Sequence, residues 1–166
     1  MQTILQNHNR KVLSETKPKA NPRCNCQVKA SCPVPGECCE PSVVYHATLT
    51  HDDGRTAEYV GCTEPNFKKR YANHKKSFRH IDYKSETTLS TYVWDNALNP
   101  SPNIKWKFLK KCSIYETGNK SCDLCLSEKF YIIKNLHKKT LINKRTDIGK
   151  KCLHKRKCTL QQTTSI

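Results

Sequence analysis

Five polar residues in this chain have the types that hydrolysis of a phosphodiester bond requires: Tyr45, Tyr59, Arg70, His74 and Glu128. The reaction needs an activated oxygen nucleophile, positive charge beside the phosphate and help for the departing alkoxide. A single carboxylate such as Glu128 commonly binds Mg²⁺ together with water and a substrate phosphate. The planar guanidinium of Arg70 is suited to holding phosphate oxygens. Each residue is common in proteins, so the interpretation depends on whether the fold brings all five together.

The two tyrosines fall in segments whose pattern is typical of a β-hairpin. Residues 43–50 alternate in polarity and are rich in β-branched side chains, which predicts a strand. The Asp-Asp-Gly sequence that follows favours a turn, and residues 56–62 form the returning strand. Tyr45 and Tyr59 are therefore expected on neighbouring strands, where Gly61 would let a ligand backbone approach closely.

A helical pattern follows the hairpin. Thr63 is expected to cap this helix, with Glu64 and Pro65 in its first turn. Apolar and aromatic residues fall on one face of it at helical spacing: Phe67, Tyr71, His74 and Phe78. Arg70 and His74 are four residues apart, so they project from the same side of the helix.

The remaining pattern predicts two more helices and one more strand. The expected elements are a helix over 88–97, a half-exposed strand over 103–110, a helix over 121–136 and a short extended segment over 140–143. This order predicts an α/β fold with a small, largely antiparallel three-stranded sheet flanked by helices.

The 11 cysteines indicate bound metal. Their odd number, and an N-terminus without the apolar run of a signal peptide, favour metal ligation over disulfide pairing. Residues 24–40 form no helix or strand pattern, so we expect a zinc knuckle there, with ligands from Cys24, Cys26, Cys32 and Cys38 or Cys39. A second zinc site is expected from Cys122, Cys125, Cys152 and His154, with Cys158 and nearby histidines as alternative ligands. Cys62 and Cys112 are expected to fill apolar space.

Positive charge dominates the chain, which has 30 Lys and Arg against 14 Asp and Glu and a net charge of +16. Residues 134–158 hold ten basic residues and one acid, Asp147. Clustering of this kind favours phosphate contact, so a nucleic acid such as DNA is the expected partner. The expected DNA contacts are Lys68, Lys69, Lys75, Lys144, Arg145, Lys155, Arg156 and Lys157. The basic runs also favour a nuclear location, and no segment is apolar and long enough to span a membrane.

Taken together, these motifs resemble the GIY-YIG endonuclease family. The resemblance begins with Tyr45, Tyr59-Val60-Gly61, Arg70 with His74, Glu128 and Asn143. It narrows to the endonuclease of Penelope-like retroelements through the cysteines ahead of Val43-Val44-Tyr45 and through further matching segments: Phe67 to His74, Ser77 to Arg79, Thr88 to Trp94, Cys122 to Lys129, and Asn143 to Arg145. Including residues 8–13, the similarity covers about residues 4 to 158.

The resemblance implies a role for each matching residue. Glu128 would bind the catalytic Mg²⁺ or Mn²⁺, and Arg70 would hold the phosphate. Tyr45 would act as general base, although an unperturbed phenol has a pKa of about 10 and needs positive charge nearby. Tyr59 and His74 would orient the water or the phosphate, with His74 as an alternative base, and Asn143 would hydrogen-bond within the site. One departure from the family pattern is Val43, which stands where the family has glycine.

The implied function is a metal-dependent DNA endonuclease that nicks DNA for target-primed reverse transcription. The chain looks like the C-terminal part of the element's reverse transcriptase protein, acting with that polymerase in cis or in trans. The alternative is a catalytically inactive zinc- and DNA-binding fragment of such an element. The expected organisation is a polar linker over 1–23, a zinc knuckle over 24–40, an endonuclease domain over 43–158 with a basic C-terminal part, and a tail over 159–166.

Overall fold

The computed structural model describes residues 23–98, 102–119 and 121–154. Several expectations fall outside these ranges: nearly all of the polar linker, the tail, and three of the expected DNA contacts, Lys155, Arg156 and Lys157. Within the described ranges, no helix is both long and apolar enough to cross a membrane.

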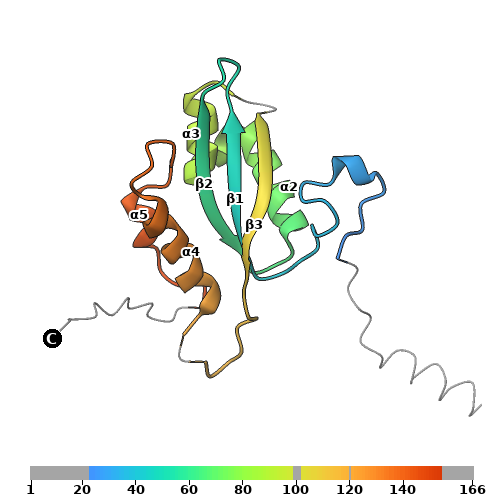
Figure 1. Ribbon diagram of the computed structural model, residues 1–166, viewed down its shortest axis with the longest axis vertical. Coiled ribbons are helices and arrows are strands. Elements are labelled where there is room, and N and C mark those ends of the chain that lie inside the picture. The colour runs from blue at the N-terminus through green and yellow to red at the C-terminus, as the bar shows by residue number, and fades with distance from the viewer. Residues whose placement is uncertain (1–22, 99–101, 120, 155–166) are drawn as a thin grey trace, which may run out of the picture.

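The centre of the fold is a three-stranded antiparallel sheet in the order β2-β1-β3 (Figure 1). The strands are β1 (Val43–Thr50), β2 (Thr56–Thr63) and β3 (Asn103–Lys111). A tight turn joins β1 to β2, and its glycine, Gly54, has a φ of 82°, a conformation that costs glycine little. The predicted α/β fold with a small antiparallel sheet is thus confirmed.

Helices cover both faces of the sheet because β1 and β2 carry apolar side chains on both sides. Alternate residues of β1, from Val43 to Leu49, pack against α2 (Phe67–Arg79) and α3 (Thr88–Asp95). Val44 and Val60 face the other way and pack against α4 (Asp123–Asn135). The short helix α5 (Arg145–Ile148) lies beside α4 (Figure 1). The sheet therefore separates two small cores, with α2 on one side and α4 on the other.

The free edge of β2 is extended by the segment that follows α4. Glu58 donates its backbone N–H to Thr140 O at 2.7 Å, and Ile142 donates to Glu58 O at 2.9 Å. These bonds form a parallel bridge between Glu58 and Leu141. Of the extended segment predicted over 140–143, the structure has a single bridge at Leu141, after a turn at Thr140, and this bridge protects part of an edge that would otherwise expose unpaired backbone groups.

The start of α2 corrects one expectation. Thr63 does not cap this helix, because it pairs with Val43 as the last residue of β2. The capping residue is Asn66, whose side chain accepts a hydrogen bond from Lys69 N at 3.0 Å. Two short helices, α5 and the 3-10 helix η2 (Ile81–Glu86), were not expected, since neither carries an apolar face long enough to produce a periodic pattern.

The cysteine-rich segment packs against the beginning of α2 (blue in Figure 1) and contains a short 3-10 helix, η1 (Lys29–Ser31). Two N–H groups of the first turn donate to carbonyls of this segment, Phe67 N to Glu40 O at 3.1 Å and Lys68 N to Cys38 O at 2.7 Å. These are N–H groups that a helix cannot satisfy within itself. The segment therefore supports the helix that carries Arg70 and His74.

Candidate functional site

A pocket of about 310 Å³ opens beside the end of β2, between α2 and α4. Three of the six predicted catalytic residues line it: Tyr59 from β2, Arg70 from α2 and Glu128 from α4. The other three, Tyr45, His74 and Asn143, are not among its lining residues and lie buried behind it. The fold thus places three of the six residues in the pocket wall and the other three in a buried layer of side chains.

A hydrogen-bonded chain links Arg70, Tyr45 and His74. Arg70 Nε donates to the Tyr45 hydroxyl at 3.0 Å, and that hydroxyl lies 2.8 Å from His74 Nε2. Burial, with the positive charge of Arg70, holds the pKa of His74 well below its usual range, so the ring is neutral and its Nε2 can accept a hydrogen bond from the Tyr45 hydroxyl. Burial also raises the pKa of Tyr45 to about 12, despite the opposing effect of Arg70. Because Nε is engaged with Tyr45, the terminal amino groups of Arg70 remain for a ligand.

The absence of a side chain at Gly61 leaves room for this series of hydrogen-bonded side chains. Tyr45 lies opposite Gly61 in the β1–β2 ladder. A β-carbon added to Gly61 would stand 2.6 Å from the Tyr45 hydroxyl oxygen and 2.8 Å from the Tyr59 ring. The close approach expected here for a ligand is therefore made by the protein's own tyrosines, which corrects that expectation.

Glu128 is half-buried, and burial raises the pKa of its carboxyl group, opposed by a hydrogen bond with the Cys62 thiol and by the charges of Lys150 and Arg70. Cys62 packs against the α4-side core, as expected of an apolar filler, but it also lines the pocket beside Glu128, a role that was not expected. The alternation of β2 puts Cys62 on the α4 side, but only the fold shows that Glu128 meets it there. Cys112 is half-buried and packs at the margin of the α4-side core.

Asn143 acts on the backbone of β2. Its side-chain oxygen accepts from Val60 N at 2.7 Å, and its amide nitrogen donates to Val60 O at 2.9 Å. Val60 lies between Tyr59 and Gly61, so Asn143 fixes the strand where both tyrosines are positioned. The structure gives Asn143 a supporting position rather than a place on the pocket wall.

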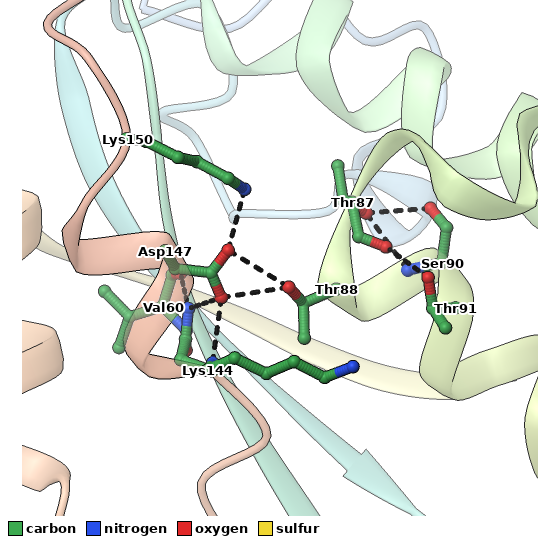
Figure 2. Close-up of polar contacts among 9 residues, drawn as sticks. Val60, Thr87, Thr88, Ser90, Thr91, Lys144, Asp147 and Lys150 are labelled. Atoms are coloured by element: carbon green, nitrogen blue, oxygen red, sulfur yellow. Dashed lines mark hydrogen bonds and ion pairs between the residues drawn. The ribbon is translucent and has the colours of Figure 1, made fainter.

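Asp147 was not predicted as a site residue, yet it is buried and connects three segments around the pocket (Figure 2). Its carboxylate accepts from Thr88 Oγ1 at 2.9 Å, from Lys144 N at 3.0 Å and from Lys150 Nζ at 2.7 Å. Burial would raise the pKa of this carboxyl group, but these bonds outweigh it and the pKa is lowered. Its only sequence signal is that it is the single acid in a strongly basic segment.

The same carboxylate positions Lys150, which lines the pocket with Glu128 and Arg70. Thr88 lies in the first helical turn of α3, where Thr87 caps the helix by accepting from Ser90 N (Figure 2). A carboxylate near a helix N-terminus is favourable. Asp147 therefore connects α3 with α5 and holds the ammonium group of Lys150 at the rim of the pocket.

Four thiols of the N-terminal segment form a cluster that could hold a metal ion such as zinc: Cys24, Cys26, Cys32 and Cys38. Sulfur atoms stand 3.7 Å apart for Cys24 and Cys32 and 3.5 Å apart for Cys26 and Cys38. Tetrahedral zinc with Zn–S bonds of about 2.3 Å separates its sulfurs by about 3.8 Å, so the four thiols fit it. The alternative ligand, Cys39, instead donates to Asn25 Oδ1.

A second group of thiols joins the start of α4 to the C-terminal segment and could also hold a metal ion: Cys122, Cys125 and Cys152, all buried. His154 stands beside it, with Nδ1 at 3.4 Å from Cys122 Sγ. Its other nitrogen, Nε2, is 2.8 Å from Glu64 Oε1, and its ring stacks on Tyr115 at 4.0 Å. A carboxylate on the far nitrogen is the usual support of a metal-binding histidine.

The described basic residues expected to contact DNA lie on two surfaces. Lys69 and Lys75 are exposed on α2, and Lys144 and Arg145 are exposed at α5. Lys68 is half-buried and donates to Asn25 Oδ1 at 2.7 Å, so its ammonium group is already engaged with the cysteine-rich segment.

The chain matches no protein-family model, no curated protein and no solved structure.

Proposed function

We propose that this protein is a metal-dependent DNA endonuclease of the GIY-YIG type, with the pocket beside β2 as its active site. The observation that carries the proposal is the meeting of Arg70 and Glu128 in one pocket, although they come from helices on opposite faces of the sheet. A guanidinium and a carboxylate suit phosphate and divalent-metal binding, respectively. The net charge of +16 supports a polyanionic substrate.

Glu128 is the residue that would hold the divalent cation. Its half-buried carboxyl group lines an open pocket and its pKa is raised by burial, which is the environment that a bound cation relieves. Mg²⁺ there would supply electrostatic stabilisation of the phosphate and of the leaving oxygen. Arg70, fixed through Nε by Tyr45, would direct its terminal amino groups at the phosphate. Lys150, held by Asp147, adds positive charge at the rim.

Tyr45 and Tyr59 have different roles in this proposal. Tyr45 has no exposed surface, and its hydroxyl is hydrogen-bonded to both His74 and Arg70, so its geometry favours holding Arg70 over the role of base that the resemblance implies. Tyr59 lines the pocket and is the tyrosine available to orient the attacking water. His74 keeps the Tyr45 hydroxyl oriented toward Arg70.

The wider function follows the resemblance to Penelope-like retroelements. We propose that the nick leaves a 3′ hydroxyl end from which the element's reverse transcriptase, in cis or in trans, begins synthesis in the nucleus. The alternative is a non-cleaving zinc- and DNA-binding module, which the two thiol clusters and the exposed lysines would serve equally well.

One assay separates the two functions. Purified protein with Mg²⁺ or Mn²⁺ should convert supercoiled plasmid to the nicked form, and Glu128→Gln should abolish nicking while DNA binding persists. Glu116→Gln, the same change at an exposed position outside the pocket, should leave nicking intact. Wild-type protein that binds DNA without nicking it would establish the binding module, and nicking by Glu128→Gln would remove Glu128 from the mechanism.

A further inference from the structure

A second hollow, of about 240 Å³, flanks α2 on the side away from Arg70. Its lining consists of aromatic, aliphatic and basic side chains: Tyr71, Lys75, Phe78, Arg79, Pro102, Ile104 and Trp106. A helix turns by about 100° per residue, so Lys75 and Arg79 project about 140° and 180° around the axis from Arg70. We call this hollow the aromatic groove.

The chemistry of the aromatic groove fits a nucleotide. The half-buried rings of Tyr71 and Trp106 meet edge to face, with centroids 5.9 Å apart. The ammonium group of Lys75 lies 5.6 Å from the centre of the Tyr71 ring, and Lys75 and Arg79 are both exposed. Aromatic walls bind unpaired bases by stacking, and flanking cations bind the phosphates of the same strand. An apolar ligand would have no use for the two cations.

Basic residues connect the aromatic groove with the pocket. Lys69 and Lys76 are exposed on the outer face of α2, at angles between those of Arg70 and Arg79. An α-helix with its side chains is only about 10 Å thick. One strand that passes over α2 can therefore contact Arg70 on one side and the aromatic groove on the other.

The aromatic groove also touches the buried part of the site. The Trp106 ring packs against His74, with centroids 5.3 Å apart, and His74 hydrogen-bonds Tyr45. A base that contacts Trp106 is thus separated only by that side chain from His74, which belongs to the hydrogen-bond network that positions Arg70.

We propose that the aromatic groove binds an unpaired base of the DNA strand that crosses α2, so that the protein engages single-stranded or frayed DNA beside the bond it cuts. The identity of the strand as a substrate rests on the proposed function. Binding of an unpaired base does not, since it requires neither Glu128 nor a catalytic metal.

Tryptophan fluorescence tests the proposal directly. The chain has two tryptophans, and Trp94 donates its Nε1–H to Ser77 O away from the aromatic groove, so Trp94→Phe leaves Trp106 as the only reporter. In the Trp94→Phe, Glu128→Gln protein, short oligothymidylate should quench Trp106 emission. A blunt duplex of equal length should quench it much less, because its bases are already stacked. Equal quenching by both ligands, or by neither, would overturn the proposal.

Matched variants locate the effect. Lys75→Glu with Arg79→Glu should weaken oligothymidylate binding at least about tenfold, and Tyr71→Leu, which keeps an apolar side chain, should weaken it about 5- to 100-fold. Lys134→Glu with Lys139→Glu changes the net charge equally at exposed positions around the end of α4 and should have a clearly smaller effect. Equal losses in the two double variants would overturn the proposal. Quenching of the single-tryptophan protein, found together with a wild-type protein that never nicks plasmid, would refute only the nuclease.

Discussion

The Tyr45 hydroxyl occupies the space that a side chain at Gly61 would fill. An ideal β-carbon on Gly61 would lie 2.6 Å from the hydroxyl oxygen and 2.8 Å from the carbon that bears it. The same hydroxyl receives Arg70 Nε–H and faces His74. The missing side chain at one position of β2 is thus a condition for the geometry of Arg70.

Gly61→Ala should therefore destabilise the protein and impair cleavage together. The added carbon must displace the Tyr45 ring, and overpacking of this kind costs about 1–3 kcal/mol. Urea unfolding followed by circular dichroism measures the loss. Gly149→Ala is the control, because its β-carbon would approach nothing closer than 3.6 Å, and its stability should change by less than about 0.5 kcal/mol. Equal stability of both variants would contradict the packing argument.

The two motif tyrosines should respond differently to loss of their hydroxyls. Tyr45→Phe leaves buried His74 and the Arg70 Nε without their partner, which should cost about 1–3 kcal/mol in unfolding free energy. Tyr59→Phe changes a residue of the pocket wall and should lower the nicking rate with little change in stability. Paired measurements of unfolding and nicking test this division, and the reverse pattern would contradict it.

Because His74 is buried, we expect the free energy of unfolding to decrease as the pH falls from about 7 to 5, a range above the usual pKa values of carboxyl groups. Its folded-state pKa is lowered well below its usual value, whereas an unfolded histidine titrates near about 6.5. The unfolded state therefore binds more protons between these two values. Stability is complete above pH 6.5 and falls as pH decreases, by on the order of 1–2 kcal/mol between pH 7 and pH 5.

The matched variant for this effect is His74→Gln, which removes the titrating ring. It should be less stable at pH 7 but should show a flatter dependence on pH between 7 and 5. His46, whose pKa burial also lowers, contributes in the same direction and accounts for part of the remaining slope. An unchanged slope in His74→Gln would show that His74 is not the group responsible.

Asp147→Asn should destabilise the structure around the pocket, although Asp147 is not one of the residues that line it. The variant loses the charge that holds Lys150 and weakens the bond from Thr88, at a cost of about 1–3 kcal/mol. Nicking should fall as well, because Lys150 is no longer held at the rim. Asp95→Asn, which breaks the exposed pair with Lys84, should change stability by less than about 1 kcal/mol. Similar effects of the two substitutions would contradict a special role for Asp147.

Metal content provides the fifth prediction. Protein purified without chelators should carry zinc at both thiol clusters, measured by mass spectrometry of the metal. Cys32→Ser should remove the N-terminal zinc and lower the melting temperature, whereas Cys39→Ser, seven residues away and outside the cluster, should keep it. Retention of both zinc ions in Cys32→Ser would show that Cys32 is not a required ligand, and wild-type protein without zinc would show that the clusters are not assembled around it.

Local pattern was sufficient for the three strands and the longer helices of this fold but not for the short helices or the layer behind its pocket. The hairpin and the four-residue spacing of Arg70 and His74 follow from periodicities that a short segment contains. Cys62 and Glu128 are 66 positions apart in the chain, and nothing near either residue indicates that they meet. The Asp147–Thr88 contact spans 59 positions and is equally invisible in the sequence.

The cysteine clusters could be predicted from the sequence only in part. Close spacing of Cys24 and Cys26, or of Cys122 and Cys125, predicts a metal centre because neighbouring thiols are already near each other. The choice between Cys38 and Cys39 could not be made this way, since adjacent residues point in different directions. It is settled by the path of the chain, which turns Cys39 toward Asn25.

The hydrogen bonds from Phe67 and Lys68 to Glu40 and Cys38 have a consequence for how this protein can vary in evolution. Two carbonyls of the cysteine-rich segment accept from the first turn of α2, and one of them belongs to Cys38, whose thiol joins the cluster, so a change in either part is expected to disturb the other. We therefore expect the cysteine-rich segment and the helix bearing Arg70 to vary together.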